Sequence, residues 1–155
     1  MTEHRMDWQR EARTGTAEAV FCSGKTDAQL RAILDEARCG KHRLLMTRLS
    51  IEQHARLGSA APEDYDPLSQ TAILGEIVDQ TPGVGIVAAG TSDLPVVTEA
   101  ARTLEFHGYE ASKLTDVGVA GLWRLTEQLE ALTAHRVLIA VCLLYTSPSP
   151  RDPIG

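Results

Sequence analysis

The chain has 155 residues, with 21 acidic against 15 basic side chains, a formal net charge of −6 and a hydrophobic content of 43%. This length suits one domain or two small ones. The acidic balance argues against a nucleic-acid partner, because phosphate binding needs basic surfaces. No apolar run approaches the ~20 residues that cross a bilayer, and the N-terminus is too polar for a signal peptide, so we expect a cytoplasmic protein with no membrane partner.

The first half of the chain predicts a small α/β domain over residues 1–82. Thr26 with Gln29 and Ser50 with Gln53 have the spacing of capping boxes, so a helix is expected to start after each. The other elements expected here are a short helix at 7–13 ended by Gly15, strands at 19–22 and 44–47, and a mostly irregular region at 60–74 with one short extended piece. The pair Pro82-Gly83 marks the expected domain boundary.

The second half alternates regularly between strand and helix patterns. The expected elements are strands at 85–89, 110–114 and 136–141, a helix carrying Val97 and Leu104 and ended by Gly108, and a helix whose core stripe is Leu122, Leu125, Leu129 and Leu132. Such alternation is typical of crossovers on a parallel sheet, with ligands at the carboxyl ends of the strands. We therefore expect residues 83–141 to form a partial doubly wound parallel sheet, of the flavodoxin or Rossmann kind.

The junction at residues 85–95 carries the main functional signal. An apolar run ends at Gly90, which lets the backbone turn and a ligand come close, and Thr91, Ser92 or Asp93 can cap the helix that follows. Pro95 suits the first turn of that helix. The free N–H groups of a helix start can hold an anionic oxygen, so the junction predicts a phosphate site. A well-capped turn without a ligand is the alternative.

Other candidate residues have equally ordinary interpretations. Lys25 could approach a phosphate or be a solvated turn lysine, and Asp116 could accept from a ribose hydroxyl or simply form a turn. The three cysteines, Cys22, Cys39 and Cys142, lack the paired spacing of a zinc or redox site, and we expect buried, small apolar side chains. The five histidines are also scattered, so no zinc site is predicted.

The last segment, residues 142–155, has three prolines at 148, 150 and 153 and cannot form the crossover helix that a strand at 137–141 requires. It resembles translated adapter or vector sequence, and we expect it to be non-native or disordered, the alternative being a Pro-rich linker. Aliphatic side chains at 137–139 would then lack partners, and we expect poor solubility or association through this edge.

Four segments in order, at 18–26, 65–75, 89–96 and 116–124, resemble the LarB family of nickel-pincer nucleotide cofactor biosynthesis. The second half also resembles the PurE family of aminoimidazole ribonucleotide carboxylases and mutases. The PurE turn has the form Gly-Ser-x-Ser-Asp, and Gly90-Thr91-Ser92-Asp93 is one residue shorter, which favours LarB. Trp123 stands where LarB proteins usually have histidine.

The LarB resemblance implies an enzyme that carboxylates the pyridinium ring of nicotinic acid adenine dinucleotide and hydrolyses its phosphoanhydride. The products would be pyridinium-3,5-biscarboxylic acid mononucleotide and AMP. It implies CO2 or bicarbonate as co-substrate, allows Mg2+, and implies no tightly bound cofactor and a homo-oligomer. The substrate-binding residues it implies are Gly90, Thr91, Ser92, Asp93, Asp116, Gly118, Val119, Gly121 and Arg124.

The LarB family attacks the ring with a cysteine thiolate from a segment beyond the strand at 137–141. Cys22 and Cys142 do not match that segment, so no catalytic residue is assigned and the chain as given is expected to be inactive. Two other interpretations stay open, a PurE-type carboxylase or mutase and a non-catalytic nucleotide-binding module.

Overall fold

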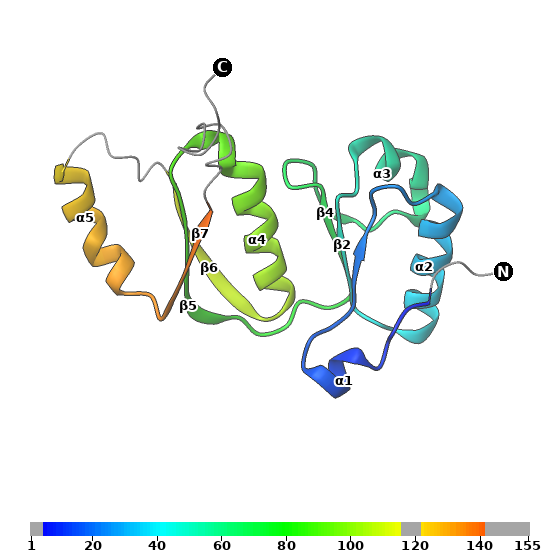
Figure 1. Ribbon diagram of the computed structural model, residues 1–155. Coiled ribbons are helices and arrows are strands. Elements are labelled where there is room, and N and C mark those ends of the chain that lie inside the picture. Colours follow the sequence, from blue (N-terminus) through cyan, green and yellow to red (C-terminus); the bar gives the residue numbers. More distant parts are fainter. Residues whose placement is uncertain (1–4, 116–121, 142–155) are drawn as a thin grey trace, which may run out of the picture.

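The structure, a computed structural model, describes residues 5–115 and 122–141, with side chains for all of these except 122–127. Layers of helix and sheet alternate across the molecule (Figure 1). Helix α4 (Leu94–Phe106) lies between two sheets, and helix α5 (Leu122–Thr133) lies beyond the second sheet. The fold is mixed α/β, as the sequence predicts.

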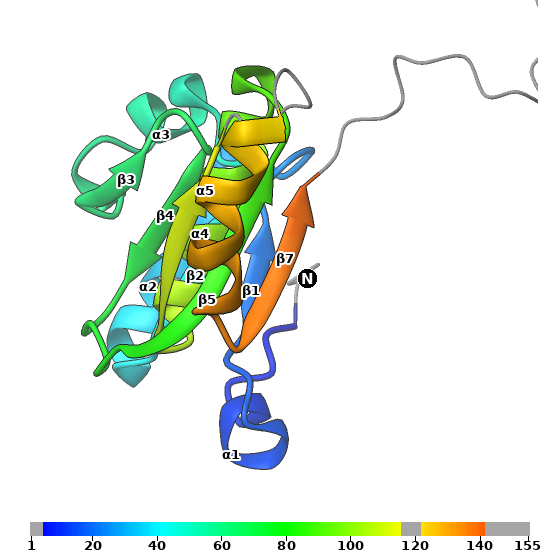
Figure 2. The ribbon, with the colours of Figure 1, turned by 90° about the vertical axis from the view of Figure 1, so that its left-hand side faces the viewer.

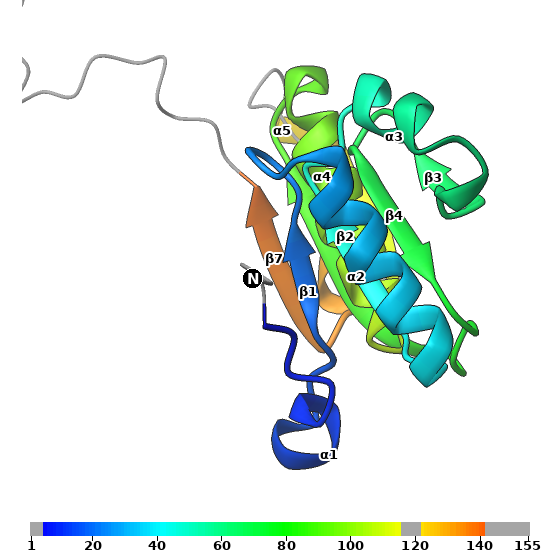
Figure 3. The ribbon, with the colours of Figure 1, turned by 90° about the vertical axis from the view of Figure 1, so that its right-hand side faces the viewer.

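The first sheet has the strand order β1-β2-β4-β3. Strands β1 (Ala19–Phe21) and β2 (Leu44–Thr47) are parallel and match the predicted strands. Helices α2 (Asp27–Gly40) and α3 (Ile51–Leu57) begin at the two predicted capping boxes, in which both hydrogen bonds are present. Helix α2 crosses the outer face of this sheet (Figure 3). The short helix α1 (Arg10–Thr14) ends at Gly15, as predicted.

The expectation of a mostly irregular region at 60–74 is wrong. A short 3-10 turn (Gly58–Ala60) is followed by a hairpin of β3 (Asp64–Asp66) and β4 (Thr71–Leu74), and β4 also pairs with β2. The turn of the hairpin is closed by Asp66, which accepts hydrogen bonds from the amide of Ser69, at 2.9 Å, and from the Ser69 hydroxyl. Strand β3 has the sequence Asp-Tyr-Asp, and aspartate is depleted in strands, which is why the sequence pattern missed the hairpin.

The second sheet is fully parallel, with the order β6-β5-β7. Its strands are β5 (Thr81–Ala88), β6 (Tyr109–Leu114) and β7 (Val137–Val141), and Figure 2 shows them running in one direction. The expected strand start at 85 is too late, because Pro82 and Gly83 lie inside β5. They occupy an irregularity in its pairing with β6 between Thr81 and Val84, where a proline is tolerated.

Helix α4 is buried from both sides. Its Phe106 packs with Ala17, Leu45 and Ile73 against the first sheet. Its Val97 packs with Ile86 and Ala88 of the second sheet. The core of the first sheet on the α2 side is separate and is built from Val20, Cys22, Leu30, Ile33, Leu34, Ala37, Leu44, Met46, Leu49, Leu57 and Ala72. A helix with two apolar faces thus joins the two sheets.

The region around β7 is less covered than the sequence predicts. Leu129 of α5, expected in the core, is 46% exposed, and Val137 and Leu138 of β7 are 53% and 47% exposed. The stripe on α5 marks an amphipathic helix, but helical spacing alone does not say how closely its apolar face is covered. Of residues 137–139, which the sequence analysis expects to lack partners, Val137 and Leu138 are exposed, whereas Ile139 packs against the cluster of Ile86, Ala88 and Val97.

Candidate functional site

The carboxyl ends of the three parallel strands meet at one edge of the second sheet. Val87 near the end of β5 pairs with Leu114 at the end of β6, and Ala88 pairs with Val141 at the end of β7. The chain goes from β5 to β6 on one side and then to β7 on the other side of β5. The strand order therefore reverses beside β5, and α/β proteins bind ligands at such a reversal.

The predicted phosphate turn lies at this edge. Residues Thr91–Asp93 form a 3-10 turn that runs directly into α4, and Pro95 occupies its first turn, as expected. The expected side-chain cap is absent, because neither Gly90 nor Asp93, the cap positions of the 3-10 turn and of α4, makes a side-chain capping bond. Thr91 and Ser92 are exposed. The N-terminal amides of α4 are thus left without a capping side chain at the edge where a ligand would arrive.

The backbone conformation at Gly90 does not require glycine, contrary to the expectation that this residue lets the chain turn. Its φ of −146° is extended backbone that any residue can adopt, so the fold does not require glycine here. A Cβ placed on Gly90 would meet only the Ser92 hydroxyl, at 3.8 Å. The backbone at Gly90 is therefore open to close approach, which is the second of the two roles predicted for it.

Asp93 is the most unusual side chain of the turn. The residue is only 4% exposed, yet its Oδ1 atom has no hydrogen-bond partner among the residues that the structure describes. A buried polar atom without a partner is costly, and native proteins satisfy nearly all such atoms. A hydroxyl donor on a bound ligand would satisfy it, whereas a second anion would not.

The other predicted site residues are not described in the same detail. Asp116, Gly118, Val119 and Gly121 lie outside the described residues. Arg124 lies on α5, but its side chain is not among those described. Residues 116–121, which contain the first four, follow β6 in the sequence, and the end of β6 lies beside β5 at Leu114. The structure therefore brings together Gly90, Thr91, Ser92 and Asp93, and it does not test the grouping of the rest.

A buried polar network that the sequence did not predict connects the hairpin to α4. The Asp66 carboxylate accepts from Ser69, whose hydroxyl lies 2.8 Å from that of Thr71. Arg102 of α4 donates from Nε to the Thr71 hydroxyl at 3.2 Å, and its Nη2 lies 2.7 Å from Asp64 Oδ1. The signal available in sequence was the run of polar residues at 64–71, but its partner lies 31 or more residues away.

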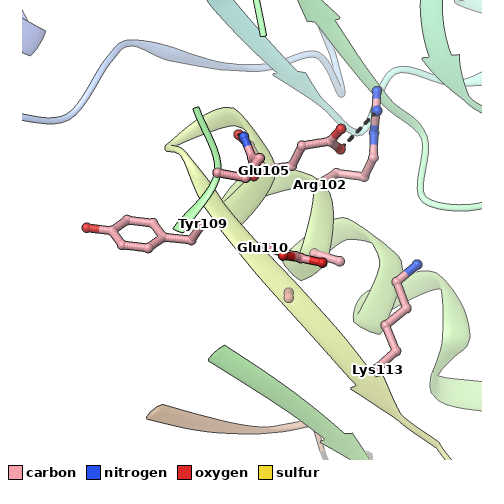
Figure 4. A pocket seen from close by; sticks show the side chains of 8 residues that line it. Arg102, Glu105, Tyr109, Glu110 and Lys113 are labelled. Carbon is pink, nitrogen blue, oxygen red and sulfur yellow. Dashed lines mark hydrogen bonds and ion pairs between the residues drawn. The ribbon is translucent and has the colours of Figure 1, made fainter. Parts of the chain in front are cut away.

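A cavity of about 350 Å3 lies beside this network, between α4 and β6 (Figure 4). It is lined by Arg102 and Lys113 together with Glu105, Glu110 and Tyr109. Cationic and anionic side chains alternate around it, and Arg102 is held by Glu105 at 3.4 Å. This mixed lining does not favour an anion, so the cavity gives no reason to move the predicted phosphate site away from the Gly90 turn.

Of the two described cysteines, Cys22 is not suited to nucleophilic chemistry. Cys22 is buried in the core, and burial raises the pKa of its thiol to about 12, although Lys25 opposes the shift. The thiol is therefore protonated at neutral pH and a poor nucleophile. Cys39 is exposed on α2, so the expectation that it is buried is wrong. Cys142 lies outside the described residues.

Two further features bear on the ligand classes that the chain could hold. Within residues 5–115 and 122–141, no group of three or more His, Cys, Asp or Glu side chains is placed to hold a metal ion. None of the helices in these ranges is long and apolar enough to cross a membrane.

Comparisons with known proteins place the chain beside one family. Residues 1–76 match the family model described as the LarB/PurE-like N-terminal domain. The chain is also 33% identical over 145 residues to the uncharacterized protein MJ0165 of Methanocaldococcus jannaschii, a match that covers 86% of this chain. The chain spans only 56% of the length of that relative.

Proposed function

Because the chain belongs, through residues 1–76, to the LarB/PurE-like family, we propose that it is part of an enzyme that binds nicotinic acid adenine dinucleotide at the Gly90 turn. The family suggests a carboxylase-type enzyme. In the specific reaction proposed, the pyridinium ring gains a carboxylate from CO2 or bicarbonate, and water cleaves the phosphoanhydride to release AMP and pyridinium-3,5-biscarboxylic acid mononucleotide.

One observation carries this proposal, namely the combination at one turn of open helix N–H groups and the buried, unpaired Oδ1 of Asp93. Amides at a helix start favour a phosphate group. A buried carboxylate oxygen favours a hydroxyl donor such as ribose. A ribose phosphate offers both chemistries a few bonds apart, and a dinucleotide contains two such units.

The proposed chemistry needs a nucleophile as well as a binding site. A pyridinium ring is electron-poor, so a thiolate must first add to it, which turns a neighbouring ring carbon into an enamine-like nucleophile for CO2. Loss of the proton from that carbon and departure of the thiolate then restore the aromatic ring. Cys22 cannot supply the thiolate, given its raised pKa. We therefore propose that this chain binds the dinucleotide and that the reacting cysteine belongs to a family segment not represented among its described residues.

A thermal-melt comparison separates the two family substrates. The proposal expects nicotinic acid adenine dinucleotide to raise the melting temperature of the chain and aminoimidazole ribonucleotide to leave it unchanged. The reverse result would favour a PurE-type carboxylase or mutase. Equal stabilisation by simple adenine dinucleotides without a pyridine acid would favour a non-catalytic nucleotide-binding module.

A substitution at Gly90 tests the location of the site. Since a Cβ has room there, Gly90→Ala should leave the unfolding free energy unchanged or slightly raised. If the phosphate approaches the backbone at this position, the same change should weaken dinucleotide binding at least fivefold. Ser59→Ala, at an exposed serine of the other sheet region, is the control and should change neither quantity. Unaltered affinity of the Gly90→Ala variant for the dinucleotide would mean that the ligand does not bind at this turn.

A further inference from the structure

We propose that Arg102 is a positioning residue, through which the first sheet fixes the anion-binding end of α4. This inference rests on the proposed function for the identity of the ligand, but its structural part does not depend on that ligand. Arg102 lies in the middle of α4, about 12 Å along the helix from Leu94 at its start. A rigid helix transmits the position of such an anchor to its end.

The contacts of Arg102 reach a buried hydroxyl and a carboxylate of the first sheet and one carboxylate of α4 itself. The side chain is only 14% exposed, and its three nitrogens contact Thr71, Asp64 and Glu105 at 3.2, 2.7 and 3.4 Å. Thr71 is fully buried in β4, and its hydroxyl continues through Ser69 to Asp66. Figure 4 shows Arg102 and Glu105 extending from α4 toward each other at the edge of the cavity. A planar guanidinium with several partners specifies an orientation that a single ion pair does not.

Other polar contacts also join α4 to the first half of the chain, and one of them, from Arg43 to the Phe106 carbonyl, lies at the last residue of the helix. Arg48 lies 3.7 Å from Glu99, but its side chain is 55% exposed, and exposed ion pairs contribute little. The apolar contact of Phe106 holds the opposite end of the helix, far from the Gly90 turn. Among these polar contacts with the first sheet, those of Arg102 are therefore the ones best placed to fix the orientation of α4, whose start also packs on the second sheet through Val97.

Backbone amide NMR signals of Thr91, Ser92 and Asp93 in the ligand-free chain provide the test, alongside the dissociation constant for nicotinic acid adenine dinucleotide. Arg102→Ala and the near-isosteric Thr71→Val should both move these signals and raise the dissociation constant at least fivefold, and Arg102→Lys should lie between them and the wild type. Arg56→Ala breaks an ion pair of similar length, 2.7 Å to Asp27, that does not involve α4, and it should change neither readout.

Unmoved signals of the Gly90 turn in a folded Arg102→Ala or Thr71→Val variant would overturn the positioning role. A shift that occurs equally in Arg56→Ala would also overturn it, because it would reflect general loosening. If the wild-type chain binds no dinucleotide, the proposed function fails, while the amide signals still decide whether Arg102 fixes the turn.

Discussion

The guanidinium of Arg43 lies 4.4 Å from the centre of the Phe106 ring and also donates to the carbonyl of the same residue. Arg43 comes from the start of β2 and Phe106 from the end of α4, so this pair joins the two sheets. Phe106 is 1% exposed, and Arg43 also reaches Glu76 in the linking segment at 3.1 Å. The contact explains why α4, which belongs to the second half of the sequence, packs as part of the first sheet's core.

The two phenylalanines of the chain offer a matched pair for measuring this interface. Phe106→Ala should lower the unfolding free energy by about 3–5 kcal/mol, because it leaves a cavity between α4 and the first sheet. Phe21→Ala, at a side chain that is 59% exposed, should cost less than about 1 kcal/mol. Urea denaturation monitored by circular dichroism measures both. Similar losses for the two variants would mean that Phe106 is not buried as described.

The capping box of Ser50 and Gln53 should stabilise the protein by more than the capping of α3, because Gln53 also contacts another part of the core. Gln53 closes the box on Ser50 and donates from Nε2 to the carbonyl of Cys22 at 3.0 Å. Gln53→Ala should therefore cost about 1–3 kcal/mol, since it removes the hydrogen bonds to the Ser50 amide and to the Cys22 carbonyl, which keeps only its bond from the Lys25 amide. Ser50→Ala, which removes only the cap, should cost about 1 kcal/mol. Equal costs in urea denaturation would show that the contact with Cys22 contributes nothing.

The ionisation of Asp66 should make the free energy of unfolding depend on pH in the acidic range. Burial raises the pKa of its carboxyl, but the hydrogen bonds from Ser69 outweigh this and hold the pKa below the usual 3.8. A lowered pKa in the folded state stabilises the protein above about pH 3.8, and this contribution disappears as the pH falls through the folded value. Asp66→Asn should thus be less stable than wild type at pH 7, and the difference should narrow as the pH falls below about 3.8. A gap that stays constant as the pH falls through this range would contradict the assignment.

The cysteines should differ sharply in reactivity. In a Cys142→Ser background at pH 8, iodoacetamide should alkylate the exposed Cys39 within minutes and leave Cys22 unmodified, because the burial that raises its pKa to about 12 also blocks access. Peptide mass mapping distinguishes the two sites, and urea-unfolded protein is the control in which both should react. Rapid modification of Cys22 in the native chain would show that its thiol is accessible and reactive, and Cys22 would again be a candidate nucleophile.

The sequence predicted the elements whose signals are local. The capping boxes at Thr26 and Ser50 and the Gly-stopped helix before Gly108 depend on residues a few positions apart, and all three are present. The hairpin of β3 and β4 was missed, because β3 is rich in aspartate and β4 is stabilised by pairing with β2. Arg102 was missed for a similar reason, since its partners Asp64 and Thr71 lie on another sheet.

The backbone of the candidate site was predicted in part, and its role as a binding site stays a prediction. The strand, Gly90 and Pro95 indicated a helix start at the edge of a parallel sheet, and the structure has one there. The expected side-chain cap did not form, because an extra 3-10 turn separates Gly90 from α4. The unpaired oxygen of Asp93 could not be predicted, as its burial depends on how the turn packs in three dimensions.

Chemical-shift mapping of the chain during titration with nicotinic acid adenine dinucleotide tests the central claim most directly. The account predicts saturable changes at the amides of Gly90, Thr91, Ser92 and Asp93, with smaller changes at the ends of β6 and β7. Changes confined to the cavity lined by Arg102, Tyr109 and Lys113, or no saturable change at all, would contradict it.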